Sequence, residues 1–217
     1  MTNKPEIRIN YAYLLTGVSE ILDRHYNPGK SKLASFEQCE EWTEDYRKEW
    51  EKYQSKILSA LHDILGLKFY RDVIDVSLAQ YFIPQSEPLI IHFRNEPDLF
   101  VDVLSHELIH ILLTDNDVFQ LNNHDRRVDL IKIWKEMFGN NFDFGTLVHI
   151  PVHAVLKSLY IDYLHDESRY LRDIEKAKEL KNTKNYADAW EYVEKNDYKQ
   201  IIEELKTSYS HLKTSFI

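Results

Sequence analysis

The sequence predicts a single α+β domain that is predominantly helical, with a small antiparallel or mixed sheet placed before a strongly apolar helix. Three observations predict this class. The 217 residues include only 5 Gly and 6 Pro, so tight turns are few. Hydrophobic residues make up 43% of the chain and aromatic residues 13%, which is enough for a packed core. Apolar residues recur at helical spacing over most of the length, and strand-like residues gather in one short stretch.

The first part of the domain, residues 1–66, is expected to be two helices. Residues 5–26 carry apolar side chains at helical spacing, and Asn27-Pro28-Gly29 stops the pattern. A capping box from Ser35 to Gln38 then starts a long helix that Gly66 ends. The apolar face expected for the first helix consists of Ile9, Tyr13, Leu14, Val18, Ile21 and Leu22.

The middle part, residues 67–165, is expected to hold the sheet and the helices of a metal site. Residues 68–82 and 89–93 are rich in branched and aromatic residues and predict strands. Helices are then predicted over 97–113 and over about 125–138. A further helix starts at Thr146 or Pro151 and runs to about 165, or on to 181.

The remaining residues, 166–217, form a predicted helical extension with helices near 186–195 and 198–212. The formal charge of −9 disfavours nucleic acid and anionic membranes as partners. Cys39 is the only cysteine, which excludes an intramolecular disulfide and a thiolate zinc cluster. The first ten residues lack an apolar segment, and no uncharged run reaches 18 residues. We therefore expect a cytoplasmic protein with no membrane span.

The most informative motif is His-Glu-x-x-His at residues 106–110, inside an apolar run. Residues four apart lie on the same side of a helix, so His106 and His110 can hold one metal ion without distorting the backbone. Glu107 is placed to reach a water molecule bound to that ion rather than the ion itself. This spacing is typical of zinc-dependent peptide hydrolysis.

These residues and their flanks resemble the zincin superfamily of metallopeptidases. Val103, three residues before the first histidine, and the uncharged Leu108, Ile109 and Ile111 fit the extended signature of that superfamily. The resemblance implies one Zn²⁺ ion, a peptide or protein substrate, and cleavage of peptide (amide) bonds by a metal-bound water that Glu107 activates. In zincins the edge strand of a preceding sheet pairs with extended substrate, so residues 89–93 are the candidate substrate-binding edge.

A catalytic zinc site needs a third protein ligand. Leu113 and Asn116 stand where metzincins have Gly and His, so that subgroup is excluded. A downstream glutamate, Glu136 or Glu167, remains an alternative in the manner of gluzincins. Cys39 lacks the motif that surrounds the cysteine ligand of peptide deformylases.

The stronger candidates lie about forty residues downstream, where His149 and His153 repeat the four-residue spacing in an apolar segment. His153 is preferred as the third ligand, because it lies beyond Pro151 in the more secure part of the helix, and His149 is the main alternative. Tyr160 follows His153 by seven residues and is a candidate donor to the oxyanion. Carboxylates that could orient the ligands are Asp162 and Asp166.

The other histidines are interpreted as structural. His92 is expected to be a strand residue, and His124 to precede a helix as a capping residue. Solvent-facing positions are expected for His25, His62, His165 and His211.

Two further functional hypotheses remain open. One is a metal-binding, zincin-like regulatory or interaction protein without general peptidase activity, whose acidic, tyrosine-rich C-terminal helices cover the cleft or hold a partner protein. The other is a helical interaction protein in which the motif is accidental. The substrate, the choice between endo- and exopeptidase, and the oligomeric state do not follow from the sequence.

Overall fold

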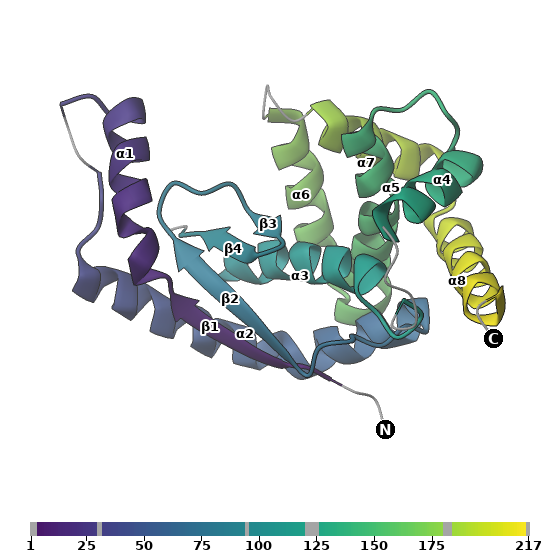
Figure 1. Cartoon of the computed structure of the whole chain (residues 1–217), viewed down its shortest axis with the longest axis horizontal. Coiled ribbons are helices and arrows are strands. Elements are labelled where there is room, and N and C mark those ends of the chain that lie inside the picture. The colour runs from purple at the N-terminus through teal and green to yellow at the C-terminus, as the bar shows by residue number, and fades with distance from the viewer. Residues whose placement is uncertain (1–3, 30–31, 94–95, 120–125, 180–183, 216–217) are drawn as a thin grey trace. The chain divides into compact units, whose positions relative to one another are not determined.

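The computed structural model describes residues 4–29, 32–93, 96–119, 126–179 and 184–215 (Figure 1). It confirms the predicted class, a predominantly helical α+β fold with a small mixed sheet. The chain divides into two compact units. We call Lys4–Ser55 with Arg71–Ile111 the sheet unit, and Lys56–Tyr70 with the described residues from Leu112 onward the helical unit.

The sheet unit is built around four strands in the order β1-β2-β4-β3. Strand β1 (Glu6–Tyr11) pairs in parallel with β2 (Val73–Ala79), and β2 pairs in parallel with β4 (Leu89–His92). The two-residue strand β3 (Gln85–Ser86) is antiparallel to β4. Strands β2 and β4 are central, and in β2 the buried Ile74, Val76 and Leu78 alternate with the more exposed Asp75 and Ser77.

Two predictions about the sheet are wrong. Residues 6–11 form strand β1 rather than the start of a helix, because Ile7, Ile9 and Tyr11 alternate with polar residues at the period of a strand. The sheet therefore begins before residue 67. Residues 89–93 are not an edge either, since β4 lies between β2 and β3, and the free edges belong to β1 and β3.

The helices of the sheet unit follow the prediction more closely. A 3-10 turn, η1 (Tyr13–Leu15), leads into α1 (Thr16–Tyr26). The long helix α2 (Phe36–Leu65) and the motif helix α3 (Pro97–Thr114) begin and end within one or two residues of the predicted bounds. Within the sheet unit the ring of Tyr46 on α2 stacks on Phe100 of α3, with centroids 4.5 Å apart and an interplanar angle of 13°.

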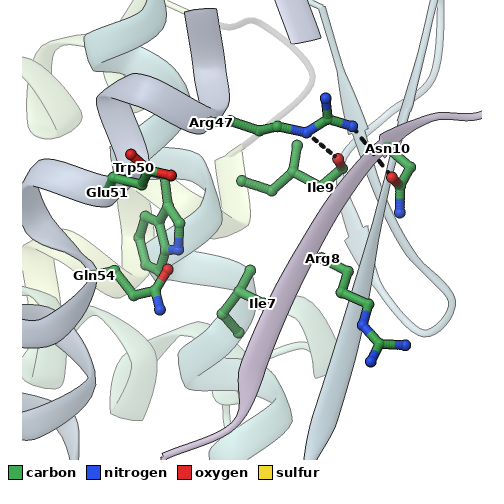
Figure 2. A pocket seen from close by; sticks show the side chains of 8 residues that line it. All are labelled: Ile7, Arg8, Ile9, Asn10, Arg47, Trp50, Glu51 and Gln54. Carbon is green, nitrogen blue, oxygen red and sulfur yellow. Dashed lines mark hydrogen bonds between the residues drawn. The ribbon is translucent and has the colours of Figure 1, made fainter. Parts of the chain in front are cut away.

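A small pocket lies between β1 and α2 (Figure 2). Its volume is about 270 Å³. Arg47 closes one side by donating from Nε to the carbonyl of Ile9 at 2.8 Å and from Nη2 to Asn10 Oδ1 at 3.2 Å. No histidine lines this pocket, so it is separate from the residues of the predicted metal site.

The helical unit is organised around the apolar helix α5 (Phe144–Ser158), which packs against α4 (Arg126–Phe138), α7 (Lys184–Lys195) and α8 (Tyr198–Ser215) and is buried over most of its length. The chain continues from α5 into a π-helical turn, η2 (Leu159–Leu164). The predicted continuation to 181 is wrong, because His165 adopts a left-handed conformation with φ 57° and ends the helix. Helix α6 (Glu167–Glu179) follows η2.

One segment of the helical unit, Phe144–Leu164, is long and apolar enough to cross a membrane by length and composition. Its 18-residue apolar window is 72% buried inside the protein. A buried core helix of a soluble protein passes the same test, so this feature is weak evidence for a membrane span.

Candidate metal centre

Helix α3 brings the two motif histidines together as predicted. The Nε2 atoms of His106 and His110 are 3.1 Å apart, and the ring centroids are 4.9 Å apart. Two nitrogens that each lie 2.0–2.1 Å from one tetrahedral zinc ion are about 3.3 Å from each other. The observed pair is thus arranged to chelate one ion, with His106 7% exposed and His110 half-buried.

Glu107 lies beside His106 in an almost entirely apolar part of the helix. It is 4% exposed, and the neighbouring Leu104 and Leu108 are fully buried. Burial disfavours the carboxylate and raises the pKa of Glu107 from 4.5 to about 8. A nearby cation would oppose that shift by favouring the charged form. A carboxyl group whose pKa lies near neutrality is suited to accept and return a proton.

The second histidine pair lies on α5, which begins at Phe144 rather than at Thr146 or Pro151. Asp143 caps the helix, because its carboxylate accepts hydrogen bonds from the Thr146 amide at 2.9 Å and from the Thr146 hydroxyl at 3.0 Å. This cap fixes the first turn of α5 and so the carbonyl of Gly145. The α5 bounds place His149 in the second turn, one turn beyond that carbonyl.

His149 has the protonation state that a metal ligand requires. Its Nδ1 lies 2.6 Å from the carbonyl oxygen of Gly145, which can only accept, so Nδ1 carries the proton and Nε2 carries the lone pair. Burial lowers the pKa of His149 to about 4, which keeps the imidazole neutral at physiological pH. Histidine ligands usually donate their second N–H to a carbonyl or carboxylate in this way.

His153 lies in a different environment, although it is only four residues away. It is fully buried, and its ring stacks on Trp190 of α7 with centroids 4.3 Å apart and an interplanar angle of 12°. The ring of Tyr186, one turn earlier on α7, lies 3.9 Å from that of His149. The pairs 149/186 and 153/190 form two aromatic layers between α5 and α7, and His153 belongs to the more enclosed layer.

Three histidines form the candidate metal group. His106 and His110 of the sheet unit and His149 of the helical unit are a set of side chains that could hold a metal ion. The alternative carboxylate ligands Glu136 and Glu167 are exposed and are not in the group. Cys39 is buried next to Gln80, whose Nε2 lies 3.4 Å from its sulfur.

The other residues predicted for the site are placed as follows. Tyr160 is buried in the π-helical turn η2, a type of distortion often found at functional sites. Asp162 accepts hydrogen bonds from Ser158 and Tyr198 and pairs with Lys199, and Asp166 accepts from Ser168. The predicted site did not include the Gly145 carbonyl, although a glycine one turn before a histidine in a capped helix is a visible signal.

The remaining histidines have structural contacts where the structure describes them. His92 is a strand residue, as predicted, and its Nδ1 accepts a hydrogen bond from the Tyr81 amide at 3.1 Å. His62 contacts the carbonyl of Leu67, and His165 contacts that of Ile161. His25 and His211 are exposed, as expected, whereas His124 lies outside the described residues.

Comparison with known proteins identifies no relative. No family model matches the chain, no curated protein matches its sequence, and no solved structure matches it. Any function proposed for the protein therefore depends on the residues of this chain alone.

Proposed function

We propose that the protein is a zinc-dependent hydrolase of peptide (amide) bonds, with His106, His110 and His149 as the metal ligands. The observation that carries the proposal is the donor set on α3 and α5. It combines two Nε2 atoms 3.1 Å apart with a third imidazole whose Gly145 contact leaves the lone pair on Nε2. Three neutral imidazoles with an open fourth position are a donor set that suits catalytic zinc. The resemblance of residues 103–111 to zincins supports the same conclusion.

The residues have distinct roles in this proposal. A bound zinc ion would supply Lewis acidity that makes water a nucleophile near neutral pH and polarises a carbonyl oxygen. Glu107 accepts the proton of the attacking water and passes it to the leaving amine, which a pKa near neutrality permits. Tyr160 remains the proposed donor to the oxyanion, and the Gly145 carbonyl holds the His149 ring in its ligand tautomer.

The proposed test compares the cleavage of a mixed peptide library by three proteins: the zinc-loaded wild type, the Glu107→Gln variant and the Glu136→Gln variant. We expect the wild type to cleave and the Glu107→Gln variant to bind zinc without cleaving, because it keeps the ligands and loses the base. Glu136 is exposed and is not in the donor set, so Glu136→Gln should match the wild type. Cleavage by the Glu107→Gln variant at the wild-type rate would refute the assignment of the base.

The same experiment separates the hydrolase from the alternative functions. Zinc binding by a wild type that cleaves no peptide would favour the zincin-like regulatory or interaction protein. A wild type that neither binds zinc nor cleaves would indicate that the motif is accidental. Each outcome thus selects one of the three hypotheses.

A further inference from the structure

Helix α1 of the sheet unit has its polar face buried and its apolar face exposed, the reverse of an ordinary surface helix. Ser19 and Asp23 are each 2% exposed. On the opposite side, Ile21 is 61% exposed and Val18 44%, and Leu14 of the preceding turn η1 is 93% exposed. Figure 1 shows α1 as the purple helix that follows β1. Of the apolar face that the sequence predicts here, Tyr13, Leu14, Val18 and Ile21 are exposed, whereas Leu22 is half-buried and Ile9 is buried in β1.

Specific polar contacts hold the helix in this orientation. The Ser19 hydroxyl donates to the carbonyl of Gln80, just after β2, at 2.7 Å. The Asp23 carboxylate accepts from the Asn27 side chain at 2.9 Å and from the Lys32 amide at 3.2 Å. Turning the apolar face inward would break the buried Ser19 hydrogen bond, which is costly because its partner would remain desolvated. The exposure of the apolar face is therefore built into the local fold.

The exposed apolar surface extends beyond α1. Tyr13, 59% exposed, and Phe36, 49% exposed, lie side by side with ring centroids 5.6 Å apart. Scaling the five exposed fractions by residue areas of roughly 150–250 Å² gives an apolar patch of about 600 Å². That is the upper end of the largest patch on a typical monomer, and patches of this size usually mark an interaction surface.

We propose that this surface binds the same surface of a second copy of the chain, with the two α1 helices antiparallel about a two-fold axis. The α1 stripe, defined as Leu14, Gly17, Val18 and Ile21, is complementary to itself in that arrangement. Leu14 faces Ile21 of the second copy, and Gly17 faces Val18 of the second copy. A Cβ atom added at Gly17 would have no atom of the described chain within 4 Å, apart from the adjacent residues and the backbone of its own helix. This space is available to the valine of the other helix.

The area of the patch agrees with a weak dimer. Two patches of about 600 Å² bury roughly 1,200 Å² in total, which is just above the lower limit of about 1,000 Å² for a specific interface. Each copy carries a formal charge of −9, so the copies repel each other at low salt. We therefore expect a reversible dimer that forms in the micromolar range and strengthens as salt screens the repulsion. This dimer is independent of the metal centre.

Sedimentation velocity of the full chain from about 1 to 500 µM tests the proposal. The wild type should dimerise reversibly. The double substitution Leu14→Glu with Ile21→Glu should weaken the dimer at least about tenfold, because it puts like charges into the interface. Ile83 is the matched control, since it is 86% exposed in the same unit and is not one of the residues of the stripe. The Ile83→Glu variant should dimerise within about twofold of the wild type, and circular dichroism should show that all variants are folded.

The Gly17→Leu variant tests the arrangement itself. It adds apolar surface in open space and improves helix propensity, so the monomer should tolerate it. Dimerisation should nevertheless weaken about tenfold, because the leucine occupies the space required by Val18 of the second copy. Stronger association of this variant would overturn the antiparallel pairing and indicate unspecific apolar contact. A wild type that stays monomeric throughout would overturn the dimer, and protection of α1 from hydrogen exchange in that monomer would show that the chain covers the stripe itself.

Discussion

The histidine pairs of α3 and α5 have the same four-residue spacing but different chemistry. On α3 the Nε2 atoms of His106 and His110 converge to 3.1 Å. On α5 the ring centroids of His149 and His153 are 5.6 Å apart; the His153 ring stacks on Trp190 of α7, and the His149 ring is tilted against Tyr186 of the same helix. Only His149 of this second pair belongs to the candidate metal group. Spacing alone therefore does not make a chelating pair, because neighbouring helices determine where each ring points.

Removing a ligand of the α3 pair should have the largest effect. His106→Ala should lower zinc affinity by more than about a hundredfold, because a direct metal–nitrogen bond is lost. Substitutions of residues that only hold a ligand in place cost up to roughly a hundredfold. Competition with a chromogenic chelator measures this affinity. His25 is exposed on α1 and provides the control, so His25→Ala should bind zinc as the wild type does. Equal affinities of the two variants would contradict a chelating role for the α3 pair.

The α5 pair should respond asymmetrically. His149→Ala should lower zinc affinity about a hundredfold, whereas His153→Ala should leave it within about twofold. The second variant should instead lose about 2–4 kcal/mol of unfolding free energy, because it leaves a cavity beside Trp190. Zinc competition and urea unfolding separate the two effects. If His153→Ala lost zinc binding and His149→Ala did not, the third ligand would be His153, as the sequence prediction prefers.

The pH dependence of stability tests whether Glu107 is buried and protonated in the metal-free protein. In metal-free protein its pKa is raised from 4.5 to about 8, so between these values the folded state holds a proton that the unfolded state has released. This contribution to stability is complete below pH 4.5 and is lost as the pH rises to about 8, at about 1.4 kcal/mol per pH unit. Urea unfolding of the Glu107→Gln variant should lack that slope.

Zinc should flatten the same slope in the wild type, because a nearby cation favours the carboxylate. Identical slopes of the metal-free wild type and the Glu107→Gln variant would contradict a buried, protonated Glu107. The comparison uses the same buffer series for all samples, so that other titrating groups cancel.

The smallest expected effect concerns the support of His149. A Cβ atom added at Gly145 would lie 2.2 Å from Asn185 Nδ2, so Gly145→Ala must displace the helix start or the asparagine. A shift of the helix start also moves the carbonyl that orients His149, and we expect zinc affinity to fall about tenfold. The double variant Gly145→Ala with Asn185→Ala removes the clash and should recover most of the affinity. Failure to recover would show that the glycine acts through another contact.

Much of the fold follows from local sequence signals. Helices α2 and α3 were predicted closely because capping residues, glycine and proline mark their ends, and apolar residues recur along their length. Strand β1 was missed because Ile9 falls at helical spacing with the apolar residues of the helix that follows. The orientation of α1 was also not predictable, since it depends on the hydrogen bond of Ser19 to Gln80, 61 residues away.

The candidate site, like the fold, was predictable where it depends on local sequence signals and not where it depends on distant contacts. The motif itself identifies His106, Glu107 and His110, because its spacing is local. The choice between His149 and His153 depends on Tyr186 and Trp190, which lie on a helix that follows more than thirty residues later in the chain. A sequence pattern places both histidines on one helix face, but it does not show which ring packs under an indole. The role of the Gly145 carbonyl likewise depends on the helix start that Asp143 fixes.

Anomalous diffraction at the zinc absorption edge, from crystals of protein never exposed to chelator, tests the central claim most directly. We expect one zinc peak about 2.0–2.1 Å from a ring nitrogen of each of His106, His110 and His149, with an open fourth position. Absence of a peak at these residues in crystals soaked with zinc would contradict the metal centre. A peak bonded to His153 in place of His149 would contradict the ligand set derived from the α5 and α7 contacts.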